Sequence, residues 1–134
     1  MKFNLEHGPG NIIHSYAAGE IKVAVARTAE TQTDRPALQS ISVSMILTPE
    51  EMILDWIAPD EALTQIHLQQ ILATEPEIVV LGTGQRLNFP DPALLAHCQQ
   101  AGVGMEVMDT GAACRTYNIL ASEGRKVCAA FMQV

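Results

Sequence analysis

The chain has 134 residues, of which 48% are hydrophobic and 17% are charged. This length and composition predict a single globular domain over residues 1–134 and exclude a low-complexity or disordered chain. The formal net charge of −7 argues against a nucleic-acid-binding protein, because a phosphate backbone requires a basic surface.

The first part of the chain predicts strands. Residues 12–26 form two apolar runs around Gly19, which is typical of a β-hairpin with its glycine at the turn. Residues 40–47 alternate apolar and polar side chains, so we expect a third strand there. The following segment, 50–60, predicts an irregular connection in which Trp56 fills the edge of the core with its indole N–H paired.

From residue 60 onward, helical and extended patterns alternate. The predicted elements are a helix from Asp60 or Thr64 to about Ala73, a strand at 77–82, a helix at 91–102, a strand at 103–108, a helix from Asp109 or Thr110 to Gly124, and a strand at 125–132. This order predicts an α/β domain with a largely parallel sheet of about five or six strands and three main helices. The N-terminal hairpin either makes this sheet mixed or forms a small second sheet.

A glycine-rich segment predicts a binding site. In open α/β sheets, the loops at the carboxyl ends of neighbouring parallel strands face each other and form pockets. Glycines allow close backbone approach, and a helix N-terminus and arginines favour an anion. The predicted site for a small carboxylate or phosphate, which we call the Gly-Thr-Gly site, consists of Gly82, Thr83, Gly84, Arg86, Thr110, Arg115 and Asn118.

The same residues also allow a purely structural interpretation. The glycines then only turn the chain, Arg86 pairs with Asp91 or Asp109, and Arg115 pairs with Glu123 or faces solvent. The Gly-Thr-Gly segment matches neither a dinucleotide-binding fingerprint nor a Walker loop, because no third glycine and no Gly-Lys-Ser/Thr follows it.

The sequence predicts no catalytic residue, no metal site and no cofactor. The histidines lack the spacing of a metal motif, and neither a Ser-His-Asp order nor a paired-carboxylate motif is present. The cysteines Cys98, Cys114 and Cys128 are expected to be free thiols. Cys114 lies near a predicted helix start, where a thiolate is favoured, but its alanine neighbours favour a buried structural cysteine.

Two segments resemble a known family. "VVLGTGQRLNFP" and "GVGMEVMDTGAACRTYNILASEGRKVCAAFM" are similar to the Mth-type domain family of unknown function, which includes mitochondrial respiratory complex I assembly factor 3 and the adipogenesis-associated Mth-domain protein. The resemblance covers nearly the whole chain, since the hairpin, the strand at 40–47 and Trp56 also fit. It implies a three-layer α/β fold built on a mixed central sheet, and it implies no known reaction.

Two classes of function follow from these features. The first is a non-enzymatic binding or assembly-type protein that docks on a protein partner, through a patch formed by Glu50, Glu51, Asp55 and the Trp56 loop. The second is a small-molecule-binding enzyme of unknown reaction that uses the Gly-Thr-Gly loop and the helix starting near Gly111. The first is favoured because the chain offers no nucleophile–base pair.

The location is predicted from apolar runs. No such run approaches ~18 residues, so we expect no membrane insertion. The first ten residues lack the apolar core of a signal peptide and do not resemble a mitochondrial presequence. We therefore expect a cytoplasmic protein.

Overall fold

The computed structural model describes residues 10–26 and 37–134. Its elements are β1 (Ile12–Ala17), β2 (Glu20–Ala24), β3 (Leu38–Ile41), β4 (Met45–Leu47), β5 (Met52–Leu54), α2 (Gln65–Leu72), β6 (Ile78–Gly82), α3 (Pro92–Gln100), β7 (Gly104–Met108), α4 (Thr110–Ser122) and β8 (Val127–Phe131). They form a five-stranded sheet in the order β5-β4-β8-β6-β7 and a three-stranded sheet in the order β1-β2-β3.

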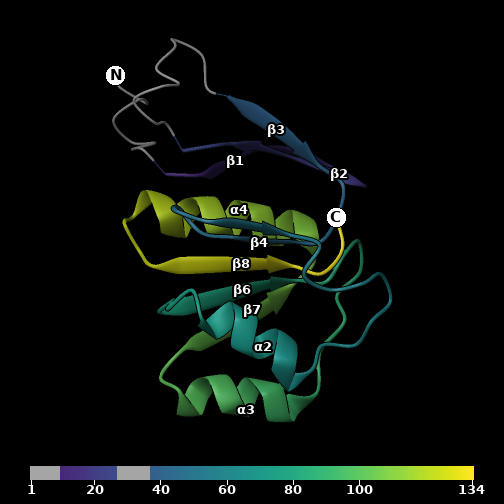
Figure 1. Cartoon of the computed structure of the whole chain (residues 1–134), viewed down its shortest axis with the longest axis vertical. Coiled ribbons are helices and arrows are strands. Elements are labelled where there is room, and N and C mark those ends of the chain that lie inside the picture. Colours follow the sequence, from purple (N-terminus) through teal and green to yellow (C-terminus); the bar gives the residue numbers. More distant parts are fainter. Residues whose placement is uncertain (1–9, 27–36) are drawn as a thin grey trace.

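The layers of the domain are visible in Figure 1. Helix α4 covers one face of the five-stranded sheet, and α2 and α3 cover the other. The three-stranded sheet packs on the outer side of α4, where β1 contacts the helix. The predicted fold class is confirmed: an α/β domain in which α4, the mixed central sheet, and α2 with α3 form three layers. The N-terminal hairpin belongs to the small sheet outside α4, and the described residues contain three helices.

The centre of the large sheet is parallel, as the sequence predicts. Strand β6 pairs in parallel with both β7 and β8. Val79, Val80 and Leu81 have no exposed surface, because helices cover both faces of this strand. The helix boundaries also follow their sequence signals. Asp91 caps α3 by accepting a hydrogen bond from the Ala93 N–H at 2.9 Å.

The segment 40–47 is not the single strand that its alternation predicts. It contributes β3 to the small sheet and β4 to the large one, and β4 runs antiparallel to β8. The break lies at Ser44, whose hydroxyl donates to the Ile57 carbonyl at 2.8 Å and accepts from the Ile57 N–H at 3.2 Å. A partner 13 residues away holds this bend, so local periodicity does not reveal it.

The structure corrects the prediction for residues 50–60 and decides between the two alternatives for the N-terminal hairpin. The predicted irregular connection at 50–60 contains β5, which pairs with β4 and forms one edge of the large sheet. The N-terminal hairpin does not join that sheet, but forms the second sheet together with β3.

Of the first ten residues, on which the location partly depends, all but Gly10 lie outside the described part of the chain. Within that part, no helix combines the length and the apolar character that crossing a bilayer requires.

Candidate functional site

The Gly-Thr-Gly loop and the start of α4 lie together, as predicted, because β6 and β7 are parallel neighbours. The Thr83 N–H donates to the Met108 carbonyl at 3.0 Å. The Gly84 N–H donates to the Thr110 hydroxyl at 2.9 Å, and the Thr110 N–H donates to the Gly84 carbonyl at 2.8 Å. The N–H groups of Thr83, Gly84 and Thr110 are therefore bonded to the protein itself.

The two hydroxyl groups of the site are also paired within the chain. Thr110 is fully buried, and its hydroxyl donates to the Gln133 carbonyl at 2.6 Å. The Thr83 hydroxyl donates to the Arg86 carbonyl at 2.7 Å and accepts from the Asn88 N–H at 3.1 Å. Both threonines thus hold the loop in shape.

Gly82 serves close packing. A Cβ atom at this position would lie 3.0 Å from Cδ1 of Phe131 and 3.1 Å from Cβ of Ala113. The space beside the strand end is therefore filled by side chains of β8 and α4. For Gly82, the geometry agrees with the structural interpretation of the segment.

Asn118 faces the small sheet rather than the Gly-Thr-Gly loop. Its Oδ1 accepts from the Ile13 N–H at 2.8 Å, and its Nδ2 donates to the Ile13 carbonyl at 2.8 Å. The neighbouring Tyr117 hydroxyl donates to the Asn11 carbonyl at 2.7 Å. These bonds fasten α4 to the start of β1.

The two arginines of the predicted site are exposed. Within residues 10–26 and 37–134, neither Arg86 nor Arg115 forms an ion pair, so the pairs that the structural interpretation predicts are not formed there. Asp109 instead caps α4 by accepting from the Ala112 N–H at 2.8 Å. This places a carboxylate at the helix start, where the predicted anion would bind.

Cys114 is buried in α4, with 4% of its surface exposed. Burial raises the pKa of its thiol to about 12, and the opposing effect of Arg115 on this pKa is smaller. Burial likewise raises the pKa of Cys128 to about 12. All three cysteines are free and buried, as predicted, and Cys114 is not a reactive thiolate at neutral pH.

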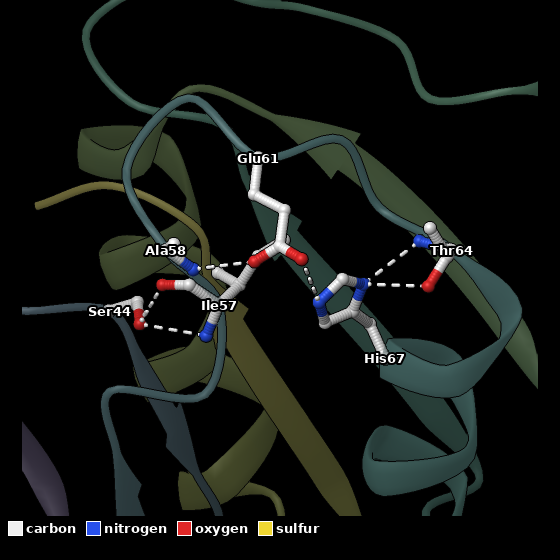
Figure 2. Close-up of polar contacts among 6 residues, drawn as sticks. All are labelled: Ser44, Ile57, Ala58, Glu61, Thr64 and His67. Carbon is white, nitrogen blue, oxygen red and sulfur yellow. Dashed lines mark hydrogen bonds and ion pairs between the residues drawn. The ribbon is translucent and has the colours of Figure 1, made fainter.

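A second polar cluster lies at the start of α2 and is shown in Figure 2. The Thr64 N–H donates to Nδ1 of His67 at 3.0 Å, and the Thr64 hydroxyl lies 3.0 Å from the same nitrogen. The His67 Nε2 lies 3.4 Å from a carboxylate oxygen of Glu61, whose other oxygen accepts from the Ala58 N–H at 2.9 Å. Because Nδ1 accepts a backbone N–H, the neutral ring carries its proton on Nε2, facing Glu61.

This carboxylate–imidazole–hydroxyl line is arranged as a helix cap. The lone pair of Nδ1, which a general base would need, already accepts the Thr64 N–H. The predicted site residues do not include this cluster, although its signal is present in the sequence. The Thr64-x-x-His67 spacing is that of a capping box, with an imidazole in place of the usual Glu or Gln. Within the described residues, no group of three potential metal ligands occurs.

Trp56 is a core residue, as predicted. It is 6% exposed, and its indole N–H donates to the Phe131 carbonyl at 3.0 Å. Its ring meets the His67 ring edge-on, with the centroids 6.0 Å apart. Glu50, Glu51 and Asp55, the acidic residues of the predicted docking patch, are exposed.

The comparisons with known proteins agree with the family resemblance. A family model described as a protein of unknown function (DUF498/DUF598) matches residues 13–132. NADH dehydrogenase (ubiquinone) 1 alpha subcomplex assembly factor 3 of Xenopus tropicalis is 41% identical over 83 residues, which are 60% of this chain and 45% of that protein. The chain thus spans about half the length of the assembly-factor relatives that it matches.

Two further relatives show the same domain. A "13 kDa major membrane protein" of Francisella tularensis subsp. holarctica is 33% identical over 87 residues, 65% of this chain and 68% of that protein. The solution structure of a Bordetella pertussis protein, described as a Mth938-like domain, superposes with a TM-score of 0.67 at 27% identity. The superposition covers 92% of this chain and 85% of that one.

Proposed function

The chain belongs to the DUF498/DUF598 family, and from this premise we propose that it is a non-enzymatic, assembly-type protein that binds a protein partner. Several relatives are named as assembly factors of NADH dehydrogenase, which supports a role of this kind. The observation that carries the proposal lies in the loop between β6 and α3. Directly after the closed Gly-Thr-Gly turn, Leu87 and Phe89 expose 53% and 67% of their surface.

An enzymatic role has less support from the described residues. The Cys114 thiol is buried, and Nδ1 of His67 is engaged by a backbone N–H. The small-anion site remains a prediction from the sequence. Arg86 and Arg115 are its exposed residues, whereas the Gly84 N–H and the Thr110 hydroxyl are bonded within the chain.

The experiment that tests the assembly-type role follows the chain in its native host. A tagged chain is separated by native electrophoresis and then by denaturing electrophoresis, at intervals after NADH dehydrogenase synthesis is induced. We expect part of the chain in complexes well above its monomer mass of 14.5 kDa, together with unfinished NADH dehydrogenase subunits and absent from the finished enzyme. A chain that migrates only as a monomer at every interval would reject the proposal.

We also propose a cytoplasmic location. One relative is described as a major membrane protein, so this location needs a test of its own. Separating the same cells into membrane and soluble fractions tests it. We expect the tagged chain in the soluble fraction, and its recovery in membranes washed with carbonate would contradict this location.

A further inference from the structure

We propose that Ile66, Leu87 and Phe89 form a docking surface for a basic amphipathic segment of a partner protein. The Ile66–Leu87–Phe89 surface rests on the proposed assembly-type function and specifies the chemistry of the partner. It differs from the patch predicted around Trp56, because that side chain is buried in the core.

The contacts of neighbouring residues place the segments that carry these three side chains at one end of the sheet. The Trp56 indole bonds to the Phe131 carbonyl, and the Met132 N–H bonds to the Gly82 carbonyl at 2.8 Å. Trp56 therefore lies where β8 and β6 end, and its ring meets that of His67 in the first turn of α2. Ile66 is in this same turn.

The loop carrying Leu87 and Phe89 leaves the same end of β6 and leads into α3. Helices α2 and α3 cover the same face of the sheet, where Leu68 and Leu94 share one apolar cluster (Figure 1). The first turn of α2 and the loop before α3 therefore belong to one end and one face of the molecule.

These side chains contribute little to the core. Ile66 is 75% exposed, whereas the next two residues of α2, His67 and Leu68, are buried. Three large apolar side chains exposed at one end are more informative than the same residues scattered singly over a surface. Apolar anchors of this kind supply much of the binding energy at protein interfaces.

The charges beside the surface indicate what binds there. Asp60 and Glu61 precede α2, Asp91 precedes α3, and all three are exposed. The loop itself contributes one cation, Arg86.

This excess of carboxylates favours a partner whose apolar side chains are flanked by Lys or Arg. It disfavours a lipid bilayer, because anionic headgroups would be repelled by the same carboxylates. A basic amphipathic helix combines an apolar face with flanking Lys or Arg side chains in one short segment.

The test uses a fluorescent Leu/Lys amphipathic peptide of about 18 residues, long enough to form a helix. A matched Leu/Glu peptide serves as the control for charge. By fluorescence anisotropy, we expect the full chain to bind the Leu/Lys peptide and not the Leu/Glu peptide. Combining Ile66→Ser, Leu87→Ser and Phe89→Ser should weaken binding by roughly 10-fold or more.

Matched control variants distinguish binding at this surface from non-specific binding. Ile119→Ser removes an apolar side chain that is 58% exposed on α4, and it should leave peptide binding within about twofold of wild type. Asp60→Asn combined with Asp91→Asn should weaken binding by about threefold to 10-fold, while Glu123→Gln should not. Asparagine keeps the capping ability of Asp91.

Several outcomes would overturn the inference. One is a triple serine variant that binds the peptide as well as wild type, and another is equal loss in the Ile119→Ser control. Co-sedimentation with phosphatidylcholine–phosphatidylglycerol vesicles that depends on the three side chains would reassign the surface to a membrane. Native complexes that persist in the triple variant would reject this surface but leave the assembly-type function standing. The absence of complexes with the wild-type chain would reject that function itself.

Discussion

The loop between β6 and α3 has two halves that differ in how their residues are used. In the first half, the N–H groups of Thr83 and Gly84 are bonded inside the protein, and Gly82 is packed against Phe131. In the second half, Leu87 and Phe89 expose most of their side chains to solvent. The glycine segment, which looks most like a ligand site in the sequence, therefore builds the fold. The less distinctive residues beside it offer the free surface.

The largest effect on stability is expected at Asn118, a residue of the predicted Gly-Thr-Gly site whose side chain bonds to β1 instead. Asn118→Ala leaves the N–H and the carbonyl of Ile13 without their partner, which should lower the free energy of unfolding by about 2–4 kcal/mol. Urea unfolding measures this loss. Ser122→Ala, on the exposed side of the same helix, should change the free energy by less than about 0.5 kcal/mol. A loss below about 1 kcal/mol at Asn118 would show that its two hydrogen bonds to Ile13 do not hold β1 to α4.

The next effect concerns the close packing at Gly82. Gly82→Ala places a methyl group 3.0 Å from Cδ1 of Phe131, and overpacking of this kind should cost about 1–3 kcal/mol. Gly104→Ala is the matched control in the neighbouring strand, since its nearest atom is Cγ1 of Ile78 at 3.9 Å. That change should be neutral or slightly stabilising. Equal losses of unfolding free energy at the two positions would show that close packing does not require glycine at position 82.

Asn118 and Thr110 also show how much of the fold and of the site could be predicted from the sequence. Local signals were sufficient for the helices and the parallel strands, because Asp91, Pro92 and the apolar run of β6 act through their immediate neighbours. The role of Asn118 depends on a partner 105 residues away, and polar periodicity places such a side chain in solvent. Nothing local reveals that the Thr110 hydroxyl is taken by Gln133. The relative position of the loops was predictable, but their hydrogen-bond partners were not.

Cys114 provides a pH test of the burial of α4. Burial raises the pKa of its thiol from 9.0 to about 12, so the unfolded chain loses this proton at lower pH than the folded one. Its contribution to stability is complete below about pH 9 and falls between about pH 9 and pH 12, by at most about 1.4 kcal/mol per pH unit. Cys114→Ala should therefore make the loss of unfolding free energy between pH 8 and pH 10 less steep. An unchanged slope would contradict the burial of this thiol.

Substitutions in the exposed half of the loop should have little effect on stability. Leu87→Ser combined with Phe89→Ser changes side chains that are 53% and 67% exposed, so the free energy of unfolding should change by less than about 0.5 kcal/mol. Urea unfolding at neutral pH measures this. A loss above about 1 kcal/mol would show that these side chains support the fold, and the contrast between the two halves would no longer hold.

The smallest effect is expected at Arg115, the residue at which a bound anion would contradict the structural role of the glycine segment. The side chain is exposed and forms no ion pair with the described residues, so Arg115→Ala should leave the melting temperature nearly unchanged. Phosphate or citrate should shift the melting temperature equally in wild type and variant, because Asp109 and Thr110 occupy the start of α4. If a bound anion depended on Arg115, losing its charge-assisted hydrogen bond would cost about 1.5–3 kcal/mol. The shift would then be larger in wild type, and the first half of the loop would be a ligand site in spite of its internal bonds.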